Sequence, residues 1–242
     1  MARALIDLLW RHHPSAPRHG ARGPRSRQRV DDVIEAAIRL ADEAGLPAAT
    51  VRAIGTALDI APMSVYTHVN SRDDLLVLMA DRVCLRMRLP AFGRSRWRTR
   101  LRRLAEANLA LFREHPWLLE IRDPRLAVGP GTIAKYDHEL RAFDGLGLSD
   151  LDRDAGLTFV LDFVRASAVA MTAESGESFV PFWADSAARL GEYVGESHPL
   201  ARRVGAAAGA ALQAPYSSAH AWTFGLGRIV DSFATQAGAD DA

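Results

Sequence analysis

The chain has 242 residues, of which 48% are hydrophobic and 24% are charged, and its formal net charge is +1. This length allows one large domain or two small ones with a buried core, and the composition excludes a globally disordered chain. The single cysteine, Cys84, excludes an intramolecular disulfide and any cysteine-rich metal cluster. No window approaches 18 consecutive apolar residues and no signal-peptide cleavage site follows the first ten residues, so we expect a cytoplasmic protein with no membrane partner.

The first 30 residues are strongly basic. They hold seven arginines against one acid, Asp7, and residues 15–24 are rich in proline, glycine and arginine. This pattern predicts a basic flexible arm over residues 1–24. Arginines in such an arm displace the counterions of a nucleic-acid backbone, but a solvated tail has the same composition, and charge alone does not distinguish the two.

The remainder of the chain is expected to be all-α, because apolar residues recur at spacings of three and four and no strand-like alternation is found. Residues 25–89 form one predicted domain, with helices over 28–44, 50–57, 62–67 and 71–88. The segment Pro90 to Gly93 predicts a hinge and the domain boundary. Residues 94–238 form a second, larger helical domain, with helices expected over 97–115, 132–144, 149–175, 182–194, 200–212 and 218–236.

Residues 50–69, TVRAIGTALDIAPMSVYTHV, have the pattern of a helix-turn-helix. Two short helices are separated by a tight break at residues 58–60, and Ile54, Leu58, Ile60 and Val65 are placed to pack the pair together. In this motif the second, recognition helix lies in the major groove of DNA. The alternative is an ordinary pair of helices inside a helical core.

Residues 28–83 resemble the DNA-binding domain of the TetR family of bacterial repressors. The resemblance rests on AAIRLADEAG in the first helix, Thr50 after it, PMSVYTHV in the recognition helix and SRDDLLVLMADRV in the helix behind it. It implies a three-helix helix-turn-helix domain that binds double-stranded DNA. By position, Tyr66, His68 and Arg72 match phosphate contacts, Thr50 and Arg52 match contacts to backbone and groove edges, and Pro62, Met63, Ser64 and Thr67 match residues that face bases.

Two positions depart from the family pattern. Asp59 stands where the family usually has the turn glycine, and Gly55 where it prefers alanine. Aspartate tolerates the left-handed conformation better than most residues, so we expect the turn to survive. Glycine at position 55 is expected to cost about 0.5–1 kcal/mol of helix stability relative to alanine.

The second half resembles, in architecture more than in motif, the C-terminal domain of the tetracycline repressor. The resemblance implies a homodimer and a pocket for an unidentified small-molecule effector. Helices 149–175 and 218–236 are the expected dimer bundle, with Gly225 and Gly227 allowing close approach; packing within one chain is the alternative for both glycines. Aromatic residues that could line the pocket are Phe112, Trp117, Phe159, Phe163 and Trp222.

The sequence gives no indication of an enzyme. It has no H-E-x-x-H, G-x-S-x-G or glycine-rich phosphate loop, and we expect no catalytic residue, cofactor or metal. The hypothesis is therefore a dimeric transcriptional regulator, a repressor that an effector releases from a pseudo-palindromic operator. An activator or a ligand-independent silencer fits the same sequence. The alternative from another class is a helical small-molecule-binding protein or enzyme whose helix-turn-helix is only structural.

Overall fold

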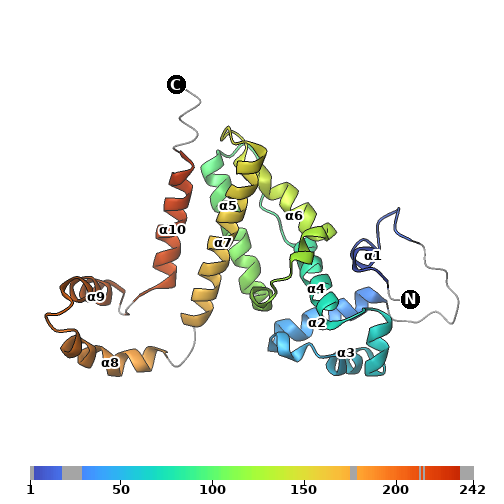
Figure 1. Cartoon of the computed structure of the whole chain (residues 1–242), viewed down its shortest axis with the longest axis horizontal. Coiled ribbons are helices and arrows are strands. Elements are labelled where there is room, and N and C mark those ends of the chain that lie inside the picture. Colours follow the sequence, from blue (N-terminus) through green and yellow to red (C-terminus); the bar gives the residue numbers. More distant parts are fainter. Residues whose placement is uncertain (1–2, 18–28, 175–178, 213, 215, 235–242) are drawn as a thin grey trace. The chain divides into compact units, whose positions relative to one another are not determined.

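The computed structural model describes residues 3–17, 29–174, 179–212, 214 and 216–234. Every regular element within these ranges is a helix, which confirms the all-α prediction (Figure 1). The α-helices are α1 (Leu5–Leu9), α2 (Val30–Ala44), α3 (Val51–Leu58), α4 (Arg72–Arg86), α5 (Trp97–Glu114), α6 (Pro130–Leu140), α7 (Asp150–Glu174), α8 (Phe179–Val194), α9 (Pro199–Leu212) and α10 (Ser218–Ser232). Short 3₁₀ helices connect them: η1 (Leu46–Ala48), η2 (Pro62–Thr67), η3 (Pro116–Glu120), η4 (Pro124–Val128) and η5 (Arg141–Phe143).

The chain divides into two compact units, residues 1–158 and 159–242. The predicted hinge at Pro90 to Gly93 is non-helical, but it lies inside the first unit rather than between the two. The physical reason is the close packing of α6 on α4. The buried carboxylate of Asp81 on α4 accepts the backbone N–H of Thr132 at 2.9 Å, and Gly131 lets the start of α6 reach the α4 backbone.

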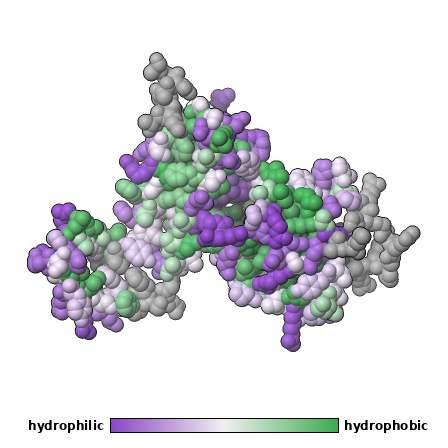
Figure 2. All heavy atoms as spheres, viewed as in Figure 1, coloured by the Kyte–Doolittle hydropathy of each residue, from purple (hydrophilic) through white to green (hydrophobic). Residues whose placement is uncertain are grey.

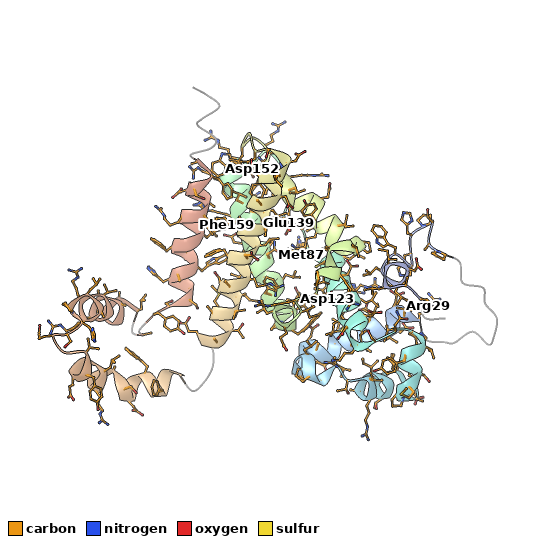
Figure 3. The ribbon with its side chains drawn as sticks, viewed as in Figure 1. Arg29, Met87, Asp123, Glu139, Asp152 and Phe159 are labelled. Atoms are coloured by element: carbon orange, nitrogen blue, oxygen red, sulfur yellow. The ribbon has the colours of Figure 1, made fainter. Side chains whose placement is uncertain are left out.

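A buried polar cluster joins α5 to α6 in the first unit. The Glu139 side chain is almost fully buried and lies between the two helices (Figure 3). One of its oxygens accepts the Asn108 amide at 2.5 Å, and the other pairs with Lys135 at 2.6 Å. A buried carboxylate is tolerated only with such partners.

The N-terminal residues differ from the sequence prediction. Residues 3–17 were expected to belong to a flexible arm, but they contain α1, whose Leu8 and Leu9 side chains are 1% and 3% exposed in the core of the first unit. The prediction is therefore wrong for this stretch, because α4 offers an apolar surface that α1 covers. Residues 18–28, which carry four of the seven arginines, lie outside the described residues.

In the second unit, α10 packs along the C-terminal half of α7. The rings of Phe163 and Trp222 stack with their centroids 5.3 Å apart, and Glu174 accepts the backbone N–H of Ser218 at 2.8 Å. A Cβ at Gly225 would lie 2.6 Å from the Phe163 ring, so this glycine serves packing within the chain, whereas nothing lies within 4 Å of a Cβ at Gly227. This contact agrees with the alternative interpretation of Gly225, packing within one chain.

Helix α7 is long and apolar enough to cross a membrane by length and composition alone, contrary to the sequence expectation. The criterion of consecutive apolar residues missed it because Asp162 and Arg165 interrupt the stretch. Only 28% of its most apolar stretch is buried by the chain itself. Green, apolar residues are visible along α10 and the neighbouring turns of α7 (Figure 2), and Phe159 and Phe224 are among the exposed ones.

Candidate nucleic-acid interface

The helix-turn-helix is built from α3, a tight turn and η2, with α2 behind them. Thr50 begins α3 by accepting the backbone N–H of Ala53 on its hydroxyl oxygen at 3.1 Å, as an N-cap residue does. Ile54 and Val65 are fully buried and hold α3 and η2 against the core. Pro62 occupies the first turn of η2, where its missing N–H costs nothing.

The turn between the two helices explains both departures from the family pattern. Asp59 adopts the left-handed conformation with φ +55°, as expected of an aspartate that replaces glycine. A Cβ at Gly55 would lie 2.9 Å from the carbonyl oxygen of Ile60 and 3.1 Å from the Cα of Pro62. The glycine predicted only to weaken α3 is therefore what allows the turn and the start of η2 to approach α3.

The outer face of η2 exposes the residues predicted to face bases. Met63 is 73% exposed, Pro62 and Thr67 are exposed, and Ser64 is half-buried. The Thr67 hydroxyl donates to the carbonyl of Ser64 at 2.7 Å, so its oxygen is left to accept a hydrogen bond. The face thus offers an apolar thioether and small acceptors, groups that suit contacts with thymine methyls and base amino groups.

The predicted phosphate contacts flank this face. Tyr66 is 41% exposed and His68 is half-buried. Burial, helped by the nearby positive charge of Arg3, holds the pKa of His68 below its ordinary value. The imidazole is therefore neutral near pH 7. A phosphate beside it would favour its protonated form.

Arg72 has a structural role that the sequence did not indicate. Its guanidinium donates to the carbonyl oxygens of Ala49 at 3.0 Å and Leu46 at 3.2 Å, and so ties the start of α4 to the first residue of η1 and to the residue that follows η1. Arg52 and Thr50 remain exposed on α3. Arg72 is exposed as well, so both arginines predicted to contact DNA lie at the surface.

The predicted effector-pocket residues do not share one environment. Trp117 is 1% exposed in the core of the first unit, where its indole N–H donates to Asp42 at 2.6 Å. Phe112 packs against the same core. The structure therefore corrects the pocket assignment of Trp117, because its ring is buried by the core of the first unit and its N–H is bonded to Asp42. Phe159, Phe163 and Trp222 belong to the second unit, where the last two stack on each other.

A hollow of about 590 Å³ lies in the first unit between α2, the end of α4 and α5. Its lining includes the apolar side chains of Ile38, Met87 and Leu111 and the charged residues Arg39 and Arg88. None of the five aromatic residues predicted for an effector pocket lines it. No local sequence pattern could indicate this hollow, because its walls come from three helices separated along the chain.

Two family models match the chain. The model described as bacterial regulatory proteins, tetR family, matches residues 33–79, which contain α3 and η2. The model described as tetracyclin repressor-like, C-terminal domain, matches residues 89–232, more than half of the chain. The chain belongs to the TetR family. Both resemblances inferred from the sequence are thereby confirmed.

A curated relative is the HTH-type transcriptional repressor DrrR1 of Streptomyces coeruleorubidus, 34% identical over 169 residues, 69% of this chain and 61% of DrrR1. The chain spans about three fifths of the length of DrrR1 and of a second curated relative, the HTH-type transcriptional regulator of Saccharopolyspora erythraea. Among solved structures, apo ActR of Streptomyces coelicolor has a TM-score of 0.71 at 23% identity and covers 88% of this chain and 100% of its own. ActR has also been solved in complex with actinorhodin.

The TetR-type fold also occurs in BioQ, solved with its natural double-stranded DNA operator. That structure has a TM-score of 0.53 and 23% identity, and covers 62% of this chain and 90% of its own. At these identities, ActR and BioQ support the fold of the chain.

Proposed function

We propose that this TetR-family protein is a DNA-binding transcriptional regulator in the cytoplasm, a repressor that a small-molecule effector releases from a pseudo-palindromic operator. The observation that carries the proposal is the exposed face of η2. Met63, Tyr66 and Thr67 project from a recognition helix whose position is set by the buried Val65 and the close turn at Gly55. The operator complex of BioQ and the repressor name of DrrR1 support the same function.

The residues divide into two roles that respond differently to substitution. Tyr66 and His68 flank the face and are assigned to phosphates, whereas Pro62, Met63, Ser64 and Thr67 are assigned to bases. Phosphate contacts hold the protein on any duplex, and base contacts select the sequence. Tyr66→Phe should therefore weaken binding to all duplexes alike, and Met63→Ala should change the preferred sequence. Equal losses on specific and random DNA for Met63→Ala would contradict this division.

Homodimerisation through α7 and α10 is part of the proposal. These helices leave apolar side chains exposed, among them Phe159 and Phe224, and a second copy would cover them. Phe224→Asp is expected to turn a dimer into a monomer in sedimentation equilibrium. A dimer that persists unchanged would place the interface elsewhere.

The effector is proposed to bind the C-terminal helical region, where Phe159, Phe163 and Trp222 are the candidate contacts. ActR, which shares the fold, binds actinorhodin in its own crystal structure, and this supports a ligand-responsive regulator. To move DNA occupancy from mostly bound to mostly free, an effector needs about a 10⁴-fold preference for the released state.

The deciding experiment is footprinting of the purified protein on the DNA flanking its own gene at 50 and 200 mM salt. A protected site with dyad symmetry that survives the higher salt would support specific recognition by a dimer and would supply the operator for an effector screen. Protection that vanishes with salt reflects backbone contacts alone. No protection, together with a monomer in solution, would favour a helical binding protein or enzyme whose helix-turn-helix is structural.

A further inference from the structure

The segment from Arg3 to Pro17 lies outside both matched family models, of which one begins at residue 33 and the other at residue 89. It is nevertheless packed on the first unit through α1. Leu8 and Leu9 are buried in the same core as residues of α2 and α4. This is an addition to the part of the chain that the family models cover, and the packing gives it a fixed place.

Polar contacts hold this segment to two further elements, in addition to its apolar packing on α4. The indole N–H of Trp10 donates to the carbonyl of Val128, at the end of η4, at 2.8 Å. The guanidinium of Arg11 pairs with Asp31 of α2 at 2.7 Å. Because α2, α4 and η4 all contact the segment, its beginning is held in position relative to the helix-turn-helix.

The beginning of the segment lies beside the end of the recognition helix. The Asn70 side chain donates to the backbone carbonyl of Arg3 at 2.8 Å, and Asn70 follows His68 by two residues. Asn70 is itself fixed, since it also donates to Asp74 at 2.8 Å, and Asp74 pairs with Arg125 at 2.8 Å. The Arg3 main chain is thus connected through two side chains to the start of α4.

The Arg3 side chain is exposed, and within the described residues no ion pair is recorded for it. Its charge is near enough to His68 to contribute to the lowered pKa of the imidazole. Asp74, the acid that Asn70 also contacts, is already paired with Arg125. A free guanidinium next to a residue assigned to a phosphate is suited to a second phosphate of the same strand.

We propose that Arg3 binds a DNA phosphate adjacent to the one held by His68, and that α1 packs against the first unit to hold Arg3 there. The inference rests on the proposed DNA-binding function and adds a contact from a residue outside the ranges that the family models match. Such a contact is electrostatic and independent of sequence. Each phosphate neutralised adds about 0.9 to the slope of log affinity against log salt, which corresponds to roughly 8-fold in affinity at 0.1 M salt.

The test measures binding of the full-length protein by fluorescence anisotropy between 50 and 300 mM salt. Two duplexes are used: a 30-base-pair mixed-sequence duplex and the duplex recovered by footprinting. Arg3→Gln should lower the salt slope by about 0.9 per protomer on both duplexes and weaken binding roughly 5- to 10-fold per protomer at 0.1 M salt. Arg3→Lys should restore most of the loss, because a point charge still binds phosphate.

Arg102→Gln is the matched control, since Arg102 is an exposed arginine on α5. It removes the same formal charge and should leave the slope unchanged. An Arg3→Gln protein with the wild-type slope, or equal losses for Arg3→Gln and Arg102→Gln, would overturn the proposal. If the wild-type protein binds neither duplex, the proposed function itself fails, so the two failures are distinguishable.

Trp10→Phe tests whether α1 holds Arg3 in place. The substitution keeps most of the ring packing and removes the hydrogen bond to Val128. It should weaken binding in the wild-type background and have little further effect when Arg3 is glutamine, because both changes act on one contact. Additive losses in the double variant would overturn this part of the proposal. Thermal unfolding of each variant by circular dichroism checks that the fold is retained.

Discussion

Replacing Gly55 by alanine tests whether the close approach of η2 to α3 is what positions the recognition helix. The added Cβ would lie 2.9 Å from the Ile60 carbonyl oxygen and 3.1 Å from the Pro62 Cα. Both obstacles are backbone atoms, so no side chain can rotate away. The turn, and the start of η2 with it, has to move.

Two effects of opposite sign set the magnitude. An extra methyl forced into a close-packed site costs about 1–3 kcal/mol, and alanine gains about 0.5–1 kcal/mol over glycine in a helix. The expected net loss of unfolding free energy is about 1 kcal/mol, within a range of about 0–2.5 kcal/mol. Because η2 begins at Pro62, the same displacement should misplace Met63 and reduce affinity for the footprinted duplex.

The assay is urea denaturation followed by circular dichroism at one fixed protomer concentration, since a dimer's stability depends on concentration. Gly205→Ala on α9 is the control, because nothing lies within 4 Å of a Cβ there. That change should stabilise the protein by about 0.5–1 kcal/mol. If Gly55→Ala is as stable as the control and binds DNA normally, the reasoning from the turn geometry is refuted.

Three further predictions concern charges and buried polar groups. Burial lowers the pKa of His68 in the free protein, and a bound phosphate would raise it, so the complex should take up a proton. DNA affinity measured by anisotropy should therefore rise as the pH falls from 7.5 to 6. The His68→Gln protein should lose this pH dependence. Asp42→Ala leaves the buried indole N–H of Trp117 without its acceptor and should cost about 1–3 kcal/mol in urea denaturation, but less when Trp117 is already phenylalanine. Glu139→Ala should cost about 3–5 kcal/mol by removing the buried partner of the half-buried Lys135, and adding Lys135→Met should recover part of that loss in the same measurement.

The helix-turn-helix could be predicted from the sequence because its determinants are local. Thr50 at an N-cap, Pro62 in a first turn and a residue able to adopt positive φ at position 59 each act within a few residues. The role of Gly55 could not be predicted in the same way. Its effect depends on where the chain goes five to seven residues later, so a propensity scale reports only the cost of glycine and not the space that glycine provides.

The N-terminal helix shows where local reasoning fails. Five residues are far too few for a helix that is stable alone, and the following stretch is rich in proline, glycine and arginine. The helix forms because α4 and α2 bury Leu8 and Leu9, contacts made with residues far along the chain. The burial of Trp117 is unpredictable for a related reason: whether an aromatic residue lies in the core or lines a pocket depends on partners such as Asp42, which is 75 residues away.

The apolar surfaces of the second unit and the exposed face of η2 each indicate, by independent arguments, that two copies of the chain act together. Helix α7 is apolar along most of its length, yet the chain buries only 28% of its most apolar stretch. An uncovered apolar helix in a protein that works in water needs a cover, and a second copy supplies one for α7 and α10 at once. A single recognition helix as short as η2 reads too few bases to select one site in a genome, whereas a two-fold pair reads two half-sites one helical turn or more apart. Recognition of the operator by η2 therefore depends on the surface that would form the dimer. A variant that separates the protomers should lose its affinity for the operator while each protomer is still folded.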